Sequence, residues 1–600
     1  MRQRLSYILK AYLVTVMIFV MAKVAFMLSY SGEQAFTVTD IMQVLYHGLT
    51  LDLSTALYIL ILPWLLTIAT VWLPVRVALF RLYYIVVALL FALAFTADTS
   101  LYAFWGFKLD ATCLDYLSTP TEAMASVTTG YLLLRLLVVI ILTTLVSWIY
   151  RRLCPTAFQP VTRRWPSLVL FLISIPLFII GIRGGLGEST TNIGQAYYSQ
   201  NQFFNHSAVN PVFSFLSSLE NTSSHIPDYR FSSDEECQQT IGELFPTESI
   251  SSDTLLNTTR PDIVIILMES AGEQFAAAMP RLQQLKRQGI FFNRCYANSW
   301  RTDRGTLCTL SGYPSFPTSS LMKMPAKSRR LPSIASSLQA QGYHTAYLYG
   351  GDINFTNMRS YLLATGFERL HWQKDYPMDQ QRSAQWGVRD DITFGTLYEM
   401  VTQSPSPYLI GYSTLSTHDP WDVPTHTRED KVQNAFSYLD GCLFSFVERL
   451  RKTPQWQNLL LIILPDHSMD YDGISEHDSR RNLIPMLWLG GAVKHPAVVS
   501  HVCNQTDLPA TLLGQMQLPH RQFRYSRDVL SKNYTQPFAV HTYNNGISVI
   551  DTTGFALYDL NTEQIAVDQS PVSQQLIHRG QMVLQAAAQE MRNMNKTPKP

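Results

Sequence analysis

Residues 262–268 read DIVIILM and are followed at once by Glu269 and Ser270. A short, nearly continuous apolar run of this kind is typical of a parallel strand that is buried on both faces. Similar runs recur at 344–349 (HTAYLY), 408–414 (YLIGYST), 459–464 (LLLIIL) and 485–490 (PMLWLG). Helix-like stretches separate the runs, near 279–288, 332–341, 391–403, 432–452 and 507–516. This alternation predicts a doubly wound α/β domain with a mainly parallel sheet.

Polar side chains follow four of these runs, at the point where each strand would end. Glu269 follows the first run, Asp352 the second, His418 the third, and Asp466 with His467 the fourth. The carboxyl ends of parallel strands share one edge of the sheet, where α/β domains bind ligands. Carboxylate and imidazole ligands suit Mn²⁺, Mg²⁺ or Zn²⁺. The sequence therefore predicts a divalent metal site at this edge.

A metal ion beside a hydroxyl group can turn that hydroxyl into a nucleophile. The segment 298–312 (NSWRTDRGTLCTLSG) offers several serine and threonine hydroxyls. Thr302 begins what reads as a helix, and a helix amino terminus would also hold an anionic phosphoryl group. We therefore expect Thr302 to be the nucleophile, with Thr306 as the second candidate and a plain helix cap as the alternative role.

The amino-terminal part of the chain has a different composition. Residues 1–184 hold 13 Lys/Arg and 7 Asp/Glu, whereas the rest of the chain holds 33 and 38. Five apolar runs fall in this part, at about 11–29, 53–73, 79–97, 131–150 and 165–182. Each approaches the roughly 20 residues that cross a hydrocarbon core of about 30 Å. Residues 1–184 are thus predicted to form an α-helical membrane domain with five transmembrane helices.

Charges around the runs predict the orientation of this domain. Arg2, Arg4 and Lys10 precede the first run, and four arginines fill the connection between the fourth and fifth. The first connection has only acidic charges. Positive charge stays on the cytoplasmic side, so the amino terminus is expected inside and the α/β domain outside. Lys23 lies near the end of the first run, where we expect it to snorkel to the interface.

The remaining segments complete the expected domain organisation. Residues 185–257 are polar and are predicted to be a linker that wraps the outer domain, which itself spans 258–525. In the segment 526–600, short strands separated by turn signals predict a small antiparallel sheet, followed by a helix and a tail. The formal net charge of +1 gives no basic excess for nucleic-acid binding.

The motifs also occur in a recognisable order. They are ILMES (266–270), RTDRG (301–305), THDPW (417–421), YLDG (438–441), PDHS (465–468) and DLPATLL (507–513). With this set, the sequence resembles the lipoteichoic acid synthase / phosphoglycerol transferase group of the alkaline phosphatase–sulfatase superfamily. Members of this group have five transmembrane helices and an outer sulfatase-like domain, which matches both parts of this chain.

The resemblance implies a chemistry. Glu269, Thr302, Asp466 and His467 would bind one divalent metal ion, with Mn²⁺ expected first and Mg²⁺ or Zn²⁺ as alternatives. Thr302 would attack the phosphorus of a phospholipid donor and form a phospho-threonine. His418 would lie near the transferred group or the leaving oxygen. A hydroxyl of a glycan or polymer would then accept the group, outside the cytoplasmic membrane of a bacterium.

One segment departs from the family pattern. The Gram-positive synthases have His-Gly-Asn followed by Phe-Trp-Asn-Arg, whereas this chain has Tyr-Gly-Gly-Asp at 349–352 and Phe-Thr-Asn-Met-Arg at 355–359. The resemblance implies phosphoglycerol as the transferred group. The replaced residues contact the head group in the family, so their replacement makes phosphoethanolamine the alternative. The candidate substrate contacts are Asp352, Asn357, Arg359, Trp386 and His477.

Other functions lead to different expectations. A true sulfatase needs Cys or Ser followed by x-Pro-x-Arg, but Cys295 is followed by YANS and Cys308 by TLSG. A hydrolytic phosphodiesterase or phosphatase would use the same metal site at the sheet edge and would need no acceptor alcohol. A non-catalytic scaffold would lose the Glu, Thr, Asp and His set, which this chain keeps. We therefore expect a transferase, with a hydrolase as the alternative.

Overall fold

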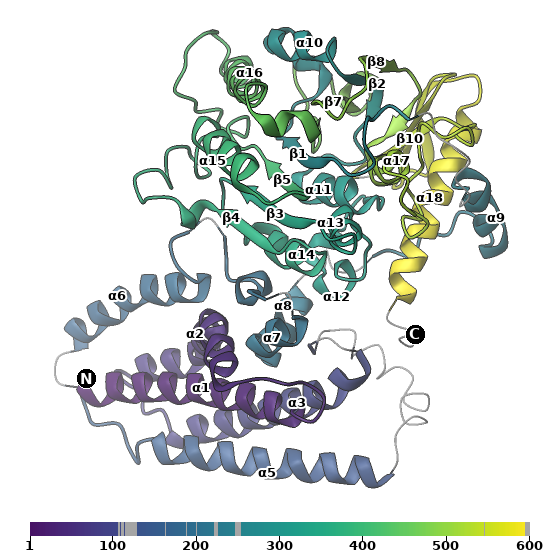
Figure 1. Ribbon diagram of the computed structural model, residues 1–600. Helices are drawn as coiled ribbons and strands as arrows, with labels where there is room; N and C mark the ends of the chain where they lie inside the picture. Colours follow the sequence, from purple (N-terminus) through teal and green to yellow (C-terminus); the bar gives the residue numbers. More distant parts are fainter. Residues whose placement is uncertain are drawn as a thin grey trace. The chain divides into compact units, whose positions relative to one another are not determined.

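A computed structural model describes residues 1–105, 108–109, 113, 129–161, 164–187, 189–199, 201–220, 226–246, 254–544 and 546–594. The chain divides into two compact units, Met1–Thr222 and Ser223–Lys599, with Pro600 grouped with the first. Figure 1 shows the helices and strands of each unit. The division falls inside the predicted linker 185–257, and the predicted boundaries at 184, 257 and 525 stay predictions.

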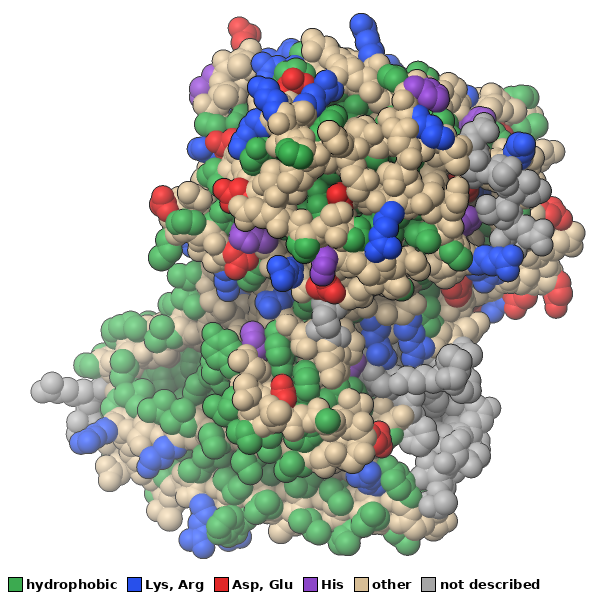
Figure 2. Space-filling view, in the orientation of Figure 1, with side chains coloured by type: hydrophobic (Ala, Val, Ile, Leu, Met, Phe, Trp, Pro, Cys, Tyr) green, Lys and Arg blue, Asp and Glu red, His purple; other side chains and the backbone are tan. Residues whose placement is uncertain are grey.

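The first unit is helical. Its long helices are α1 (Arg2–Ser29), α2 (Val38–Ala69), α3 (Val77–Trp105), α5 (Thr129–Leu153) and α6 (Arg164–Arg183). All five are long and apolar enough to cross a membrane. Large apolar side chains such as Leu133 and Leu177, 60% and 66% exposed, line their outer surfaces, and Figure 2 shows them gathered over this unit. Lipid would cover such a surface, and the five predicted spans are confirmed as helices.

Lys23 does not snorkel, so that expectation was wrong. Its side chain is 1% exposed, and Nζ lies 2.5 Å from Oδ2 of Asp52 on α2. Asn210, which lies between α7 (Gln202–Ala208) and α8 (Pro211–Glu220), donates from Nδ2 to Oδ1 of Asp52 at 3.0 Å. Gly48 makes room for the lysine, because a Cβ there would lie 2.6 Å from Nζ. The ion pair therefore ties α1, α2 and the connection between α7 and α8 together.

Removing one partner of this pair leaves the other charge buried and uncompensated. Asp52→Ala should therefore lower the free energy of unfolding of the helical unit by about 3–5 kcal/mol. The double variant Lys23→Met/Asp52→Leu removes both charges and should recover most of that loss. Thermal unfolding of the detergent-solubilised protein measures both effects. Equal midpoints for Asp52→Ala and the native chain would show that the pair does not hold the helices.

The second unit is built on a mixed sheet of nine strands. The strands are β1 (Asp262–Met268), β2 (Ile290–Tyr296), β3 (His344–Tyr349), β4 (Arg369–Trp372), β5 (Tyr408–Ser413), β6 (Leu459–Pro465), β7 (Leu483–Leu489), β8 (Ala497–Val499) and β9 (Cys503–Asn504). Their order is β4-β3-β5-β1-β6-β7-β2-β8, with β9 paired to β2. The five neighbouring strands β4, β3, β5, β1 and β6 are parallel to one another. Strand β7 is antiparallel to both β6 and β2. The predicted mainly parallel sheet is confirmed.

Helices cover both faces of this sheet, as Figure 1 shows. Alternate residues of β1 reach opposite cores: Val264 and Ile266 pack with α15 (Asp390–Gln403) and α16 (Lys431–Leu450), together with α10 (Pro280–Lys286). Ile263 and Ile265 belong to the core on the other face. That core includes α11 (Thr302–Ser311), α13 (Ile334–Gln339), α14 (Met358–Ala364) and α17 (Leu508–Gln515). The two buried cores therefore fix the positions of the strand ends and of the residues that follow them.

A separate four-stranded antiparallel sheet follows, as predicted. It comprises β10 (Phe538–Tyr543), β11 (Gly546–Asp551), β12 (Phe555–Asp559) and β13 (Gln564–Gln569). Helix α18 (Ser573–Asn593) packs on β11 and β12, and α9 (Asp234–Leu244) packs on α18. Cys237 and Ile241 of α9 lie in the same core as α18. Part of the predicted linker therefore contributes to the core of the second unit.

Candidate active site

The pairing of β1 with β6 brings two acidic residues together. The strands are parallel, with Met268 opposite Pro465. Glu269 and Asp466 are the next residues of their chains, so both leave the sheet at the same edge. Glu269 is 5% exposed and Asp466 is 1% exposed. This is the juxtaposition that the strand pattern predicted.

Thr302 reaches this edge from the first position of α11. Its Oγ1 donates to Oε2 of Glu269 at 3.0 Å and lies 3.4 Å from Nε2 of His467. Nε2 of His467 lies 3.5 Å from Oε1 of Glu269 and 3.7 Å from Oδ2 of Asp466. One ligand atom from each of Glu269, Asp466 and His467 fits within a mutual separation of 4.8 Å. The structure therefore brings all four predicted ligands together.

The donor set fits a divalent metal ion. Ligand atoms about 2.1 Å from a tetrahedral Zn²⁺ lie roughly 3.4 Å apart, and Mn²⁺ or Mg²⁺ use similar oxygen distances. The separations of 3.0, 3.4, 3.5 and 3.7 Å within the cluster are of this size. Two carboxylates, one imidazole and one hydroxyl form a hard-to-borderline set without thiolates. Glu269, Thr302, Asp466 and His467 are therefore the residues that would hold the ion.

The electrostatics of the cluster also favour a cation. Burial raises the pKa of Asp466 to about 7, and the neighbouring Glu269 carboxylate adds to the effect. Burial opposes charge on His467 as well, but Asp466 and Glu269 raise its pKa to about 9. Burial alone would raise the pKa of Glu269, yet the hydrogen bond and charge of His467 lower it to about 2. Two buried carboxylates thus need positive charge beside them, which a divalent ion supplies.

Backbone groups fix the ligand atoms. The N–H groups of Ser270 and His467 donate to Oδ1 of Asp466 at 3.0 and 2.8 Å. This leaves Oδ2 directed at the cluster. The Ser270 hydroxyl donates to Oε1 of Glu269 at 2.7 Å, and Ser270 adopts a left-handed φ of 57°. The N–H of Glu269 donates to Oγ1 of Thr414 at 2.9 Å. Ser270 and Thr414 were not predicted as supports, because nothing in their spacing marks them.

A second set of contacts orients His467. Its Nδ1 lies 3.0 Å from the carbonyl oxygen of Ser468, which also accepts from Arg481 at 2.5 Å. A hydrogen on Nδ1 satisfies that carbonyl, so Nε2 is the nitrogen that faces the carboxylates. Nε2 carries hydrogen in the metal-free cluster and would offer its lone pair to a bound ion. Outer contacts of this type set the tautomer of metal-binding histidines.

Comparison with known proteins agrees with this geometry. Residues 261–518 match the sulfatase family. We call these residues the sulfatase-like domain. Phosphoglycerol transferase I of Xanthomonas campestris is 23% identical over 285 residues, which cover 43% of this chain and 40% of that protein. Lipoteichoic acid synthase 2 of Bacillus subtilis is 22% identical over 36% of this chain and 37% of its own length. The chain thus spans about 40% of the length of these curated relatives.

Structural comparison supports the same fold. A protein of the alkaline phosphatase superfamily from Vibrio parahaemolyticus has a TM-score of 0.54 and 23% sequence identity. The match covers 62% of this chain and 99% of that one. The resemblance that the motifs predicted is confirmed, and every predicted site residue lies inside the sulfatase-like domain.

Gly305 lets α11 approach the edge of the sheet that carries Glu269 and Asp466. A Cβ at this position would lie 2.0 Å from the carbonyl oxygen of Asp466. Gly305→Ala should therefore push α11 away, cost at least about 1–3 kcal/mol of stability, and reduce activity by moving Thr302. Gly395 in α15 has no neighbour within 4 Å of an added Cβ, so Gly395→Ala should raise stability by about 0.5–1 kcal/mol. Chemical denaturation and a turnover assay compare the two; equal effects would contradict the close approach.

His418 lies after β5 and packs against another predicted residue, with the two rings tilted by 53°. Its ring centroid is 4.4 Å from that of Trp386, and both rings direct a nitrogen at the carbonyl oxygen of Asp419, at 2.9 and 2.5 Å. Phe355 packs edge-on to Trp386 with centroids 6.2 Å apart. Since Nδ1 of His418 faces a carbonyl, it carries hydrogen and leaves Nε2 for proton exchange. These three rings form an aromatic group beside the strand ends.

The other predicted substrate contacts are more dispersed. Asp352 accepts hydrogen bonds from the N–H and Nδ2 of Asn354. Asn357 has a left-handed φ of 63° at the start of α14 and donates to the carbonyl of Lys323 at 3.5 Å. The Arg359 guanidinium lies 6.0 Å from the Trp372 ring centroid. His477 is exposed in the segment between β6 and β7. Their roles in substrate binding stay predictions.

Proposed function

We propose that this protein is a membrane-anchored, metal-dependent phosphotransferase that moves a phospholipid head group through a phospho-threonine at Thr302. One observation carries the proposal: a hydroxyl at a helix amino terminus lies 3.0 Å from a buried carboxylate and 3.4 Å from a buried imidazole. A bound divalent ion would lower the pKa of that hydroxyl and neutralise charge on the phosphoryl group.

In the first step, Thr302 Oγ1 forms a bond to phosphorus while the bond from phosphorus to the diacylglycerol oxygen breaks. The Thr302 proton leaves along its hydrogen bond to Glu269. Helix α11 starts without a side-chain cap, so its first N–H groups can donate to a phosphoryl oxygen. Protonated His418 gives its Nε2 proton to the departing oxygen, which leaves as diacylglycerol.

In the second step, a hydroxyl of a glycan or polymer attacks the same phosphorus. Neutral His418 takes the proton of that hydroxyl at Nε2, and the bond from phosphorus to Thr302 Oγ1 breaks. The proton returns to Thr302, so the site is regenerated. One histidine serves both steps because the leaving and attacking oxygens occupy the same position in turn.

The location follows from the helical unit. Five helices long enough to span a membrane precede the catalytic unit, and basic residues gather at the amino terminus and after the fourth span. The positive-inside rule supports an amino terminus on the cytoplasmic side, and the bacterial relatives support the cytoplasmic membrane of a bacterium. The sulfatase-like domain then faces the outer leaflet, where phospholipid donors and envelope glycans are both present.

Phosphoglycerol is the first candidate for the transferred group. Relatives named phosphoglycerol transferase and lipoteichoic acid synthase support it. The altered sequence at 349–359 and the aromatic group of Phe355, Trp386 and His418 favour phosphoethanolamine as the second candidate, since aromatic faces attract ammonium groups.

Incubation with defined lipids tests the proposal. The full-length protein in mixed micelles receives phosphatidylglycerol or phosphatidylethanolamine, with Mn²⁺ and with or without an oligosaccharide acceptor. We expect diacylglycerol release from one lipid and attachment of its head group to the acceptor. Equal release with and without acceptor, with the head group found only as its free phosphate ester, would instead identify a hydrolase.

A further inference from the structure

One buried glutamine joins the segment before Thr302 to the strand end that carries Asp466. Gln505 begins the turn Gln505–Asp507, between β9 and α17, and is 0% exposed. Its Nε2 donates to the carbonyl oxygens of Asp466 at 2.6 Å and Pro465 at 3.1 Å. Its Oε1 accepts from the N–H of Asn298 at 3.3 Å. A single side chain thus contacts both segments through their backbones.

Asn298 is itself held in place by several hydrogen bonds. Its Nδ2 donates to the carbonyl of Val540 at 2.8 Å and to Oδ1 of Asn504 at 3.0 Å. Its Oδ1 accepts from the N–H of Ser315 at 2.8 Å. Asn298 precedes Thr302 by four residues, so fixing its backbone limits where α11 can begin.

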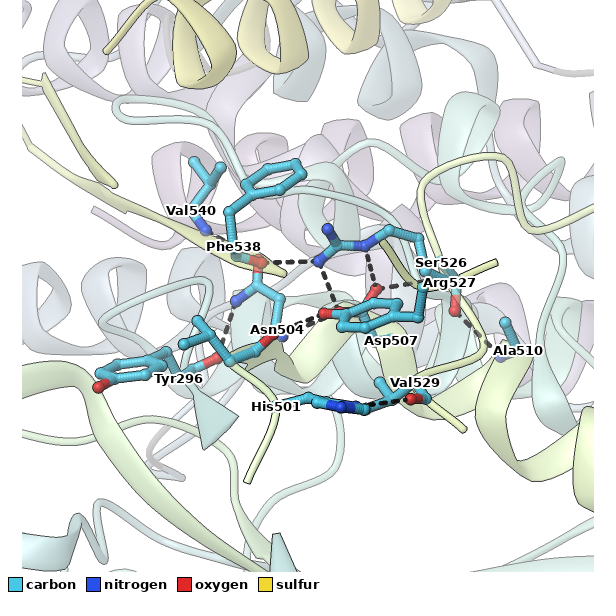
Figure 3. Close-up of polar contacts among 12 residues, drawn as sticks. Tyr296, His501, Asn504, Asp507, Ala510, Ser526, Arg527, Val529, Phe538 and Val540 are labelled. Atoms are coloured by element: carbon cyan, nitrogen blue, oxygen red, sulfur yellow. Dashed lines mark hydrogen bonds and ion pairs between the residues drawn. The ribbon is translucent and has the colours of Figure 1, made fainter. Parts of the chain in front are cut away.

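The turn that carries Gln505 is equally rigid. The carboxylate of Asp507 forms a bidentate ion pair with Arg527, at 2.7 and 3.0 Å, with both side chains buried. Arg527 also donates to the carbonyl of Phe538 at 2.7 Å. Asn504 donates to the carbonyl of Tyr296 at 2.8 Å. Figure 3 shows Asn504, Asp507 and Arg527 within one network. Gln505 therefore extends from a fixed base.

The Asp466 peptide is contacted from two directions. Gln505 donates to its carbonyl oxygen at 2.6 Å, and Gly305 of α11 packs against the same oxygen. The carbonyl belongs to a predicted metal ligand, whereas Gly305 belongs to the helix that begins with Thr302. The position of this one peptide therefore sets the separation between the nucleophile and the ligand.

From these contacts we infer that Gln505 is a positioning residue: its amide holds the Asp466 peptide and the Asn298 backbone at the separation that places Thr302 on the metal site. The role rests on the proposed function of the site, but not on the head group or the acceptor. This role also explains the DLPATLL segment (507–513), because Asp507 fixes the turn that carries Gln505.

Gln585 offers a matched control. It is also 0% exposed, and it also makes three side-chain hydrogen bonds: its Oε1 accepts from the N–H groups of Phe231 and Ser232, and its Nε2 donates to the carbonyl of Ser232. Gln505→Leu and Gln585→Leu remove equivalent groups, so both should lower the thermal midpoint by a similar amount. Only Gln505→Leu should lower kcat, by about 10- to 100-fold, with the KM for lipid unchanged.

Two further measurements keep the test decisive. Gln505→Glu keeps the oxygen that accepts from Asn298 but loses the donors to Asp466 and Pro465, and it should also lose kcat. Calorimetric titration with Mn²⁺ alone should show weaker binding in both Gln505 variants and native affinity in Gln585→Leu. This readout needs no turnover, so it separates failure of the inference from failure of the proposed function. If the Gln505 and Gln585 variants match in kcat and Mn²⁺ affinity, the positioning role is overturned.

Discussion

Thr302→Ala should reduce turnover by at least about 10³-fold while the protein still folds and binds metal. The reason is that no other hydroxyl in the described residues is shown beside both Glu269 and His467. The side chain is part of the first turn of α11 and makes no contribution to the two buried cores. Turnover, thermal unfolding and Mn²⁺ titration on the purified protein measure the three properties separately.

Two variants of the same helix serve as controls. Thr306 is buried one turn later in α11, so Thr306→Ala should leave most activity intact. Thr302→Ser keeps the hydroxyl and should retain measurable turnover. An active Thr302→Ala together with an inactive Thr306→Ala would move the nucleophile to Thr306.

Asp466→Asn should abolish metal binding and turnover without disturbing the fold. The asparagine oxygen can still accept from the N–H groups of Ser270 and His467, as Oδ1 of Asp466 does. Its NH₂ group then replaces Oδ2, the atom directed at the cluster, and cannot ligate a cation. We expect Mn²⁺ affinity to fall by more than about 100-fold, because even outer contacts of metal sites contribute 10- to 100-fold.

Thermal unfolding provides an independent measure of this loss. Free metal at about 100 times its Kd should stabilise the native protein by about 2.7 kcal/mol, and Asp466→Asn should show no such gain. Chelation of the native protein should likewise remove activity, and added Mn²⁺ should restore it. Asp472 provides a control, because it is an exposed acid between β6 and β7. Its left-handed φ of 50° is one that asparagine tolerates. Asp472→Asn should therefore show the same metal stabilisation as the native protein. Metal stabilisation retained in Asp466→Asn would exclude Asp466 as a ligand.

The sequence predicts the strands that carry the site. Strands β1, β3, β5 and β6 are mostly apolar and buried because helices cover both faces of the sheet. Their ends could therefore be located and assigned to one edge. Strand β2 was missed because Asn293 and Arg294 interrupt its apolar pattern, and Asn293 is exposed. Strand β2 leads to Thr302. Thr302 was therefore predicted as the nucleophile from its motif, and not from the strand that precedes it.

Contacts between distant segments could not be predicted from the sequence. Lys23 and Asp52 were read as separate charges, because only the packing of α1 on α2 brings them together. Gln505 is one of many glutamines in the chain, and its contacts with Asn298 and Asp466 depend on where β6, α11 and α17 lie in three dimensions. The positions of supporting residues depend on tertiary packing. Candidate metal ligands, in contrast, can be recognised from the sequence by their residue type at the ends of strands.

Mass spectrometry of the peptide that contains Thr302 tests the central claim most directly. The full-length protein is incubated with Mn²⁺ and mixed phospholipids without acceptor, quenched and digested. The account predicts a phosphodiester on Thr302 that carries the donor head group and disappears when an acceptor alcohol is added. An unmodified Thr302 during active turnover, or the adduct on another residue, would contradict it.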